Sequence, residues 1–343
     1  MKLNSRFSRM QILENTSLKS FNTFGLDCKA LYFTEVQSVE DLKTIYADAR
    51  FTNLPKLILG GGSNLLLCND FKGLVVKVAL KGVEVVGDGL IKAQAGENWH
   101  EFVLWSLNNG YNGIENLSLI PGNVGAAPMQ NIGAYGVELK DTFVELEAFH
   151  TGSKEIHVFS NSLCEFGYRE SVFKGKHKGK YIILSVTFKL KVDGEVDIKY
   201  GAIGQQLKAK DISDPSAKDV SDAVIAIRKS KLPDPSLIGN SGSFFKNPII
   251  LKSHFNRLKK SYPALPSYPV DDFKVKVPAA WLIENAGWKG KTMGAYGVHK
   301  KQALVLVNYG GALGSDIHNL AKDIQKSVDT LFSIELQLEV NIV

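Results

Sequence analysis

The sequence is poor in cysteine, and its few cysteines are badly spaced for structural chemistry. Three occur in the whole chain, Cys28, Cys68 and Cys164, which are far apart and odd in number. Neither a disulfide framework nor a metal knuckle uses such a spacing. We therefore expect a protein of the reducing cytoplasm whose thiols bind no metal.

Long apolar runs and histidine ligand motifs are also missing. No segment approaches the roughly 18 apolar residues of a membrane-spanning helix. Residues 1–11 are polar and basic, without the apolar region of a signal peptide. The seven histidines never fall into an H-E-x-x-H pattern. We expect no membrane span and no metal ion.

The chain carries only a small excess of positive charge. Lys and Arg number 41 against 35 Asp and Glu, a formal net charge of +6. Because no basic stripe is interleaved with aromatic residues, we expect an anionic small molecule rather than nucleic acid as the partner. The densest positive patch, residues 174–180, contains glycines and is predicted to be an exposed hairpin tip.

Glycine is abundant and clustered. The clusters lie at residues 59–67, 121–136 and 239–248, and the last contains Ser243 in the run Gly-Asn-Ser-Gly-Ser-Phe-Phe-Lys-Asn-Pro. Successive backbone N–H groups in glycine-rich turns form nests for anions. Any one cluster alone is more simply interpreted as an ordinary loop, whereas three together indicate ligand binding.

Two common phosphate-binding motifs are excluded. No cluster ends in Gly-Lys-Ser/Thr, so none is a P-loop. The cluster at residues 59–67 follows the apolar run Leu57-Ile58-Leu59 but lacks both the G-x-G-x-x-G spacing and an amphipathic helix after it. A dinucleotide would have to bind on a different fold.

The order of the predicted elements indicates an α+β fold that is rich in strands in its middle. Helix signals begin at Ser38, which can cap a helix, and at Pro278, placed at a first helical position. Helices are predicted near residues 39–49, 99–107, 220–229, 278–287 and 315–331, and strands at 57–59, 74–78, 90–93, 181–188 and 303–307. Composition changes after Lys191, and a second domain is expected from about residue 205.

The glycine clusters, together with Asn22-Thr23-Phe24-Gly25, Gly167-Tyr168-Arg169-Glu170-Ser171 and Leu338-Glu339-Val340, resemble one family. That family is the UDP-N-acetylenolpyruvoylglucosamine reductases, in the longer form that carries a tyrosine loop. The resemblance covers nearly the whole chain. It implies reduction of UDP-N-acetylglucosamine enolpyruvate to UDP-N-acetylmuramate for peptidoglycan synthesis, with NADPH as reductant and noncovalent FAD as cofactor.

The same resemblance implies an FAD-binding domain of the vanillyl-alcohol-oxidase (PCMH) type at residues 18–191 and a C-terminal α+β substrate domain at 205–343. FAD would be held by two loops. Their residues are Gly60, Gly61, Gly62, Ser63, Asn64, Leu65, Pro121, Gly122, Gly125, Ala126, Gln130, Asn131, Gly133, Ala134 and Tyr135.

Three residues match the family's catalytic positions. Ser243 would donate the proton to the α-carbon, Arg169 would grip the substrate carboxylate, and Glu339 would polarise the enolate. From the residues alone, the simpler interpretation is that Arg169 forms a structural ion pair with Glu165 or Glu170. Glu339 would then be a solvated strand residue beside Glu335.

Further positions match the family's substrate and NADPH contacts, namely Tyr200, Lys231, Asn247 and Gln302. The chain departs from the family after Val340, where Asn341-Ile342-Val343 replaces an arginine and an Ile-Gly pair, so that arginine is not expected to support Glu339. Two rival interpretations are a flavin oxidase of the same fold acting on a sugar or alcohol and a nonenzymatic nucleotide-sugar binding protein.

Overall fold

The computed structural model describes residues 10–192 and 194–343, which form two compact units. The second unit comprises Leu18–Cys28, Gly62–Asn69 and Ala226–Val343, and the first comprises the remainder. Two short segments of the second unit therefore precede its main segment along the chain. The main segment begins within the helix α5 (Ala217–Lys231). The binding domains expected at 18–191 and 205–343 stay a prediction.

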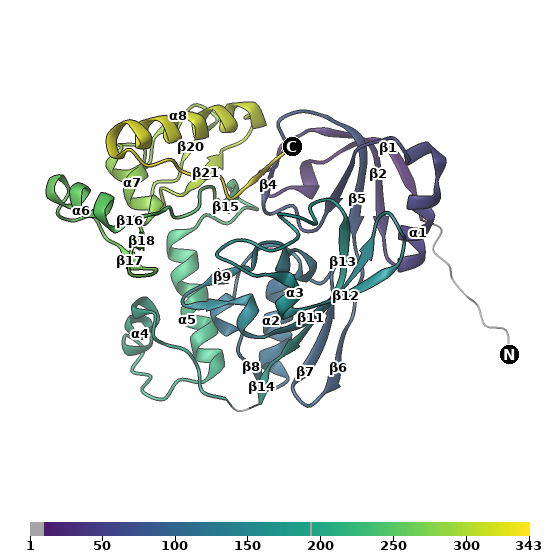
Figure 1. Ribbon diagram of the computed structural model, residues 1–343, viewed down its shortest axis with the longest axis horizontal. Coiled ribbons are helices and arrows are strands. Elements are labelled where there is room, and N and C mark those ends of the chain that lie inside the picture. Colours follow the sequence, from purple (N-terminus) through teal and green to yellow (C-terminus); the bar gives the residue numbers. More distant parts are fainter. Residues whose placement is uncertain (1–9, 193) are drawn as a thin grey trace. The chain divides into compact units, whose positions relative to one another are not determined.

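The first unit contains two principal sheets (Figure 1). One is mixed, with β5 parallel to both β2 and β3 and β1 antiparallel to β2; its order is β1 (Ile12–Ser17), β2 (Lys29–Val36), β5 (Phe71–Val78), β3 (Lys56–Leu59). The other is antiparallel, in the order β12 (Ile156–Ser160), β11 (Phe143–His150), β13 (Tyr181–Lys189), β7 (Leu90–Gln94), β6 (Val83–Gly87).

Helices and short elements complete this unit. The α-helices are α1 (Val39–Ala47), α2 (Trp99–Asn108), α3 (Asn161–Cys164), α4 (Gly201–Lys208) and most of α5. The short strands are β8 (Tyr111–Asn112), β9 (Gly133–Ala134), β10 (Val137–Glu138) and β14 (Lys191–Val192). The 3-10 helices are η2 (Ala49–Phe51), η3 (Glu115–Leu117), η4 (Val124–Ala126), η5 (Pro128–Gln130) and η6 (Leu139–Asp141).

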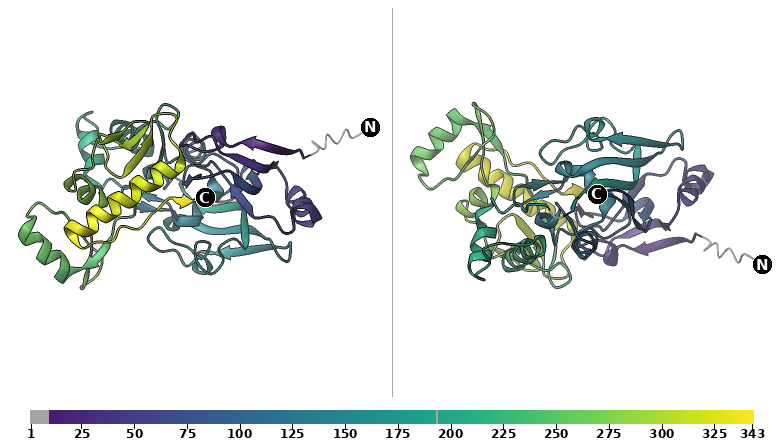
Figure 2. Two further views of the ribbon diagram at one scale, coloured as in Figure 1. Left: turned by 90° about the horizontal axis from the view of Figure 1, so that it is seen from above. Right: turned by 90° about the horizontal axis from the view of Figure 1, so that it is seen from below.

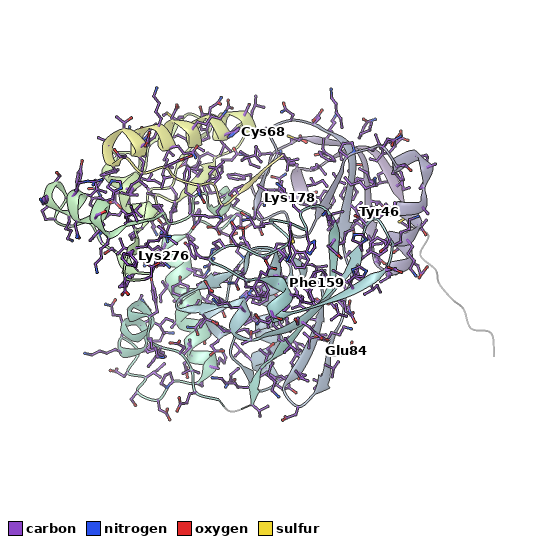
Figure 3. The ribbon with its side chains drawn as sticks, viewed as in Figure 1. Tyr46, Cys68, Glu84, Phe159, Lys178 and Lys276 are labelled. Carbon is purple, nitrogen blue, oxygen red and sulfur yellow. The ribbon has the colours of Figure 1, made fainter. Side chains whose placement is uncertain are left out.

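Local sequence explains where α1 begins, and ring packing fixes α2. Ser38 and Asp41 form a reciprocal capping box, in which Asp41 N–H donates to Ser38 Oγ at 3.1 Å and Ser38 N–H donates to Asp41 Oδ2 at 3.0 Å. Burial raises the pKa of Tyr46, on the buried side of α1, to about 12 (Figure 3). In α2, the Phe102 ring packs 5.1 Å from Phe188 of β13, so the helix is fixed to the antiparallel sheet.

The second unit is built on small sheets and short and long helices. Its strands are β4 (Leu65–Leu66), β15 (Gly239–Ser243), β16 (Ile249–Leu251), β17 (Tyr268–Pro269), β18 (Lys274–Lys276), β19 (Thr292–Met293), β20 (Tyr296–Val298), β21 (Val305–Asn308) and β22 (Asn341–Ile342). Its helices are η1 (Lys19–Phe21), α6 (Lys252–Ser261), α7 (Ala279–Asn285) and α8 (Gly314–Phe332). The strand orders are β15-β21-β20-β19, β16-β18-β17 and β22-β4.

Helix α8 covers the largest of these sheets. It contacts β20 and β21 and presents buried Ile317, Leu320, Ile324 and Val328 at helical spacing (Figure 2). Its first residue, Gly314, lies so close to the chain after β4 that a Cβ there would be 1.9 Å from the Leu67 carbonyl oxygen. Glycine at this position is therefore required by packing.

The predicted helices and strands are present, with small corrections at their ends. Pro278 occupies the N-cap position of α7 rather than its first helical position. Strand β21 begins at Val305, because Val305 N–H donates to the Gln302 carbonyl at 3.1 Å and the preceding residues turn. Residues 174–180 form turns between α3 and β13, where Figure 3 labels Lys178, so they are not a hairpin tip between two strands.

Candidate active site

The first two glycine clusters meet inside the first unit. A Cβ placed on Gly61 would lie 2.6 Å from Oδ1 of Asn123 and 2.9 Å from Cα of Gly122. No side chain fits in that space, so glycine is required here by the approach of the two loops. At Gly60 a Cβ would lie 3.7 Å from Cβ of Asn123, which is an ordinary contact.

The second cluster is tied to the sheet through the turn after β7. Gly125 N–H donates to the Ala95 carbonyl at 2.9 Å, and Asn123 Nδ2 donates to the Gly96 carbonyl at 2.7 Å. A Cβ on Gly125 would lie 2.5 Å from that of Ala95. These contacts with the turn after β7 therefore fix the position of the loop.

The side chain of Arg169 contacts the far end of the same loop. Its guanidinium donates to the carbonyl oxygens of Asn131 at 3.5 Å and Gly133 at 2.5 Å. Both Arg169 and Asn131 have left-handed backbones, with φ of 56° and 43°. These two contacts position the guanidinium at residues 131–133. Glu165, one of the expected ion-pair partners, pairs with Lys176.

Two tyrosines named by the sequence come together in this unit. The ring of Tyr135 packs edge-on against the ring of Tyr200, with centroids 5.1 Å apart and planes at 90°. Tyr135 has a φ of 52°, and Tyr200 precedes the first turn of α4. The loop expected to hold the cofactor and the segment expected to cover the substrate are therefore in contact.

In the second unit, Gly62 joins the first cluster to the Asn22-Thr23 motif. Thr23 N–H donates to the Gly62 carbonyl at 3.1 Å, and a Cβ on Gly62 would lie 2.0 Å from the Phe21 carbonyl oxygen. Among the residues that the structure describes, the N–H groups of Gly61 and Gly62 donate to no protein acceptor. Adjacent donors of this kind suit a phosphate.

Ser243 ends strand β15 at a bulge. Ser243 pairs with Val305 and Asn240 with Val307, so two residues of β15 stand opposite one of β21. Gly242 takes a φ of 69°, and its N–H donates to Oδ1 of Asn240 at 3.0 Å. The bulge fixes the direction of the half-buried Ser243 side chain.

The C-terminal segment pairs Glu339 with Phe244, the residue after Ser243. Glu339 N–H donates to the Phe244 carbonyl at 2.9 Å, and Asn64 Nδ2 donates to the Glu339 carbonyl at 3.3 Å. Asn341 N–H then donates to the Asn64 carbonyl at 3.1 Å, within the parallel pairing of β22 with β4. The last residues therefore fix the backbone of Glu339, and its side chain is half-buried.

The expected substrate contacts of this unit lie on separate elements. Lys231 is exposed at the end of α5. Asn247 accepts a hydrogen bond at Oδ1 from Ala279 N–H at 2.9 Å, at the start of α7. Gln302 accepts at Oε1 from Leu304 N–H at 3.3 Å. The two amide oxygens fix these side chains in place, and within the described residues their NH₂ groups donate to no protein acceptor.

A second serine lies near Ser243 on the same strand. Ser241 is 7% exposed, and its hydroxyl has no hydrogen-bond partner in the described part of the chain. Ser241 offers a matched control for the role of Ser243.

His299, just after β20, is also 7% exposed. Burial, together with the positive charge of Lys301, lowers the pKa of its imidazole.

Two asparagines whose side chains hydrogen-bond to the backbone of other segments were not predicted from the sequence. Asn123 holds the second glycine loop, as described above, and Asn116 in η3 donates to backbone carbonyls of two distant segments. Asn116 lies between Glu115 and Leu117, and no local sequence pattern marks it. Its partners follow only from the fold.

Neither a metal site nor a membrane helix was found. Across residues 10–192 and 194–343, no three His, Cys, Asp or Glu side chains gather in an arrangement that could hold a metal ion. In the same residues, no helix has the length and apolar character needed to cross a membrane.

Comparison with known proteins places both parts of the chain. Residues 30–158 match a family model for an FAD binding domain, and residues 234–343 match the model for the C-terminal domain of UDP-N-acetylenolpyruvoylglucosamine reductase. A crystal structure of UDP-N-acetylenolpyruvylglucosamine reductase from Thermus caldophilus has a similar fold, with a TM-score of 0.68 at 24% identity, covering 97% of this chain and 98% of that one. These matches confirm the α+β class with an FAD-binding and a C-terminal domain.

Full-length relatives give the family. A UDP-N-acetylenolpyruvoylglucosamine reductase of Flavobacterium johnsoniae is 53% identical over 339 residues, which cover 97% of this chain and 100% of the relative. One of Pseudomonas putida is 47% identical over 337 residues, covering 97% and 99%. Nothing in these comparisons supports a flavin oxidase. The resemblance drawn from the motifs is confirmed, and the chain belongs to the UDP-N-acetylenolpyruvoylglucosamine reductase family.

Proposed function

We propose that Ser243, Arg169 and Glu339 act directly on the enolpyruvyl group in the reaction of this family. The reaction is the NADPH-dependent reduction, through FAD, of UDP-N-acetylglucosamine enolpyruvate to UDP-N-acetylmuramate in peptidoglycan synthesis. The observation that carries the proposal is the hydrogen bond from Glu339 N–H to the Phe244 carbonyl, which places the backbone of Glu339 next to the residue that follows Ser243.

The glycine loops fit the FAD that the family requires. The two N–H groups without a protein acceptor, on Gly61 and Gly62, are suited to its pyrophosphate. We assign the rest of the FAD contacts to the other loop residues named from the sequence, from Gly60 to Leu65 and from Pro121 to Tyr135. When bound, FAD supplies hydride that originates from NADPH.

A pair of alanine variants tests the FAD loop. Gly60→Ala adds a methyl group that the protein accommodates at ordinary contact distance. A loss of FAD affinity in this variant would therefore show that the methyl group clashes with bound FAD. We expect a Kd about tenfold higher with an unchanged melting temperature of the apoprotein. Gly61→Ala places its methyl 2.9 Å from Gly122 Cα and should lower that temperature as well. Unchanged FAD affinity in Gly60→Ala contradicts the proposed contact.

Arg169 is suited to bind the substrate carboxylate. Its guanidinium is positioned by the carbonyls of Asn131 and Gly133. A planar guanidinium is the group that can hold both oxygens of a carboxylate in a fork. As negative charge grows on that carboxylate during reduction, fixed donors stabilise it most in the transition state. Arg169 thus binds the substrate and stabilises the developing charge.

Ser243 is suited to donate the proton, and Glu339 is suited to stabilise the enolate. The Ser243 hydroxyl donates a proton to the α-carbon, a step that a weak acid can perform because the carbanion it meets is strongly basic. A protonated Glu339 carboxyl hydrogen-bonds the enolate oxygen. The side chains would serve this chemistry from fixed backbone positions, at a bulge and in a paired C-terminal segment.

Glutamine and alanine at position 339 separate hydrogen bonding from charge. Glu339→Gln keeps a donor of nearly the same size, so we expect it to reduce substrate about tenfold faster than Glu339→Ala. Single-turnover rates with prereduced enzyme measure the difference. Equal rates for the two variants contradict a donor role for Glu339.

Four further residues complete the proposal for small-molecule binding. We assign Tyr200 to cover the substrate, Lys231 and Asn247 to phosphate groups of substrate and NADPH, and Gln302 to the uridine side. The cytoplasm is the proposed compartment, in keeping with three cysteines that are all free.

Product analysis tests the overall reaction. Incubation with NADPH and the enolpyruvyl substrate should give a UDP-sugar whose mass has increased by two hydrogen atoms, one as hydride and one as proton. UDP-N-acetylglucosamine itself, which lacks the enolpyruvyl group, should remain unchanged. NADPH oxidation without any such product argues against the proposal.

A further inference from the structure

Asn116 connects two segments that the proposed function uses separately. It lies in η3 and is 1% exposed. Its Nδ2 donates to the Tyr135 carbonyl at 3.1 Å and to the Asp197 carbonyl at 2.9 Å. Because both partners are carbonyl oxygens, the orientation of the amide is fixed, with NH₂ toward them. One side chain therefore ties together residues 135 and 197.

Each acceptor lies beside one member of the Tyr135–Tyr200 ring pair. Tyr135 is held in a left-handed conformation, with φ of 52°, and is followed by Gly136 with φ of 90°. Asp197 precedes Tyr200 by three residues, and its Oδ1 accepts from Lys199 N–H at 2.9 Å, which closes a turn into Tyr200. Asn116 thus holds the backbone on both sides of the edge-on ring contact.

Other bonds anchor η3 itself. Trp99 Nε1 donates to the Leu117 carbonyl at 2.9 Å, and the hydroxyls of Ser118 and Ser221 are 2.8 Å apart. These contacts bind η3 to α2 and α5 without the Asn116 side chain. Loss of the Asn116 amide should therefore release the segments at 135 and 197 while η3 stays in place.

We propose that Asn116 is a positioning residue, which holds the Tyr200 segment against the Tyr135 turn so that Tyr200 is presented to the UDP-sugar. The inference rests on the proposed role of Tyr200 at the substrate. Only the donors of the amide are used, since Oδ1 of Asn116 has no hydrogen-bond partner among the described residues. Without these donors, two backbone carbonyls lose their partner, and the ring pair loses its common support.

Hydrogen exchange and kinetics of the holoenzyme Asn116→Ala test the proposal together. We expect amides of residues 197–200 and 134–137 to exchange at least about tenfold faster, with residues 115–119 as protected as before. We also expect KM for the enolpyruvyl substrate to rise about tenfold, while the rate at which NADPH reduces the bound FAD stays unchanged. A role confined to general stability would move all of these quantities or none.

Ser118→Ala is the matched control, because it removes a buried hydrogen bond of the same segment but no contact to residues 135 or 197. It should leave exchange at residues 197–200 and KM unchanged. Asn116→Ser keeps one donor in a smaller side chain; it should give smaller increases, and it replaces Asn116→Ala throughout if that variant does not fold.

Combination with Tyr200→Ala distinguishes the outcomes. If Asn116 acts through Tyr200, the double variant has the same KM as Tyr200→Ala alone. Unchanged exchange at 197–200 in Asn116→Ala overturns the inference, as does an additive rise of KM in the double variant. If exchange rises but Tyr200→Ala leaves KM unchanged, the proposed substrate role of Tyr200 is wrong, and the positioning of its segment by Asn116 is supported.

Discussion

Replacement of Ser243 by alanine is expected to slow reduction of the enolpyruvyl substrate by about 10²–10⁴-fold, the usual loss when a general acid is removed. FAD content, its reduction by NADPH and binding of the UDP-sugar should stay near those of the wild type. The reason is that the backbone of the β15 bulge is fixed by its pairing with β21 and by the Asn240 side chain, which the substitution leaves intact.

Ser241→Ala is the matched control for this loss. It removes a buried hydroxyl two residues away on the same strand, and that hydroxyl has no protein partner in the described residues. We expect a rate within about twofold of wild type. Ser243→Cys should recover part of the activity, because a thiol at the same position can also donate a proton. A Ser243→Ala enzyme within about threefold of wild type removes Ser243 from the mechanism.

Arg169→Lys is expected to lower the rate of substrate reduction by about 10²–10³-fold, the range for loss of a donor that stabilises developing charge. Lysine keeps the positive charge but lacks the planar fork that holds two carboxylate oxygens. Reduction of bound FAD by NADPH should change little. Stopped-flow measurement of the two half-reactions separates these effects.

The structure adds a control for Arg169. Lys174 Nζ donates to the Arg169 carbonyl at 3.3 Å, so Lys174→Met removes a nearby positive charge and leaves the guanidinium in place. We expect only a small effect from it. Because Arg169 also bonds the Asn131 and Gly133 carbonyls, FAD content must be measured in each variant. Equal slowing of both half-reactions in Arg169→Lys indicates that Arg169 supports the loop and not the substrate.

Elements with strong local signals could be predicted from the sequence. The Ser38–Asp41 box marks the start of α1, and the spacing of Ile317, Leu320 and Ile324 marks α8. Helix α6 was not predicted, because its two large apolar side chains, Phe255 and Leu258, stand among charged and polar residues and none of its residues is buried. Its stability depends on neighbouring strands, which sequence pattern does not reveal.

For the candidate site, the glycine clusters were visible but the reason for each glycine was not. Gly61 and Gly62 are required by the close approach of Gly122 and Phe21, residues that become neighbours only in the fold. The same holds for Asn116, whose partners are 19 and 81 residues away along the chain. Side chains that join distant segments carry no local pattern.

The most direct test of the account is an anaerobic titration of the NADPH-reduced holoenzyme with the enolpyruvyl UDP-sugar. One equivalent of this substrate should restore the oxidised flavin spectrum and appear as UDP-N-acetylmuramate, whereas UDP-N-acetylglucosamine should leave the spectrum bleached. Return of the oxidised spectrum only when oxygen is admitted, with the enolpyruvyl substrate unchanged, would contradict the account.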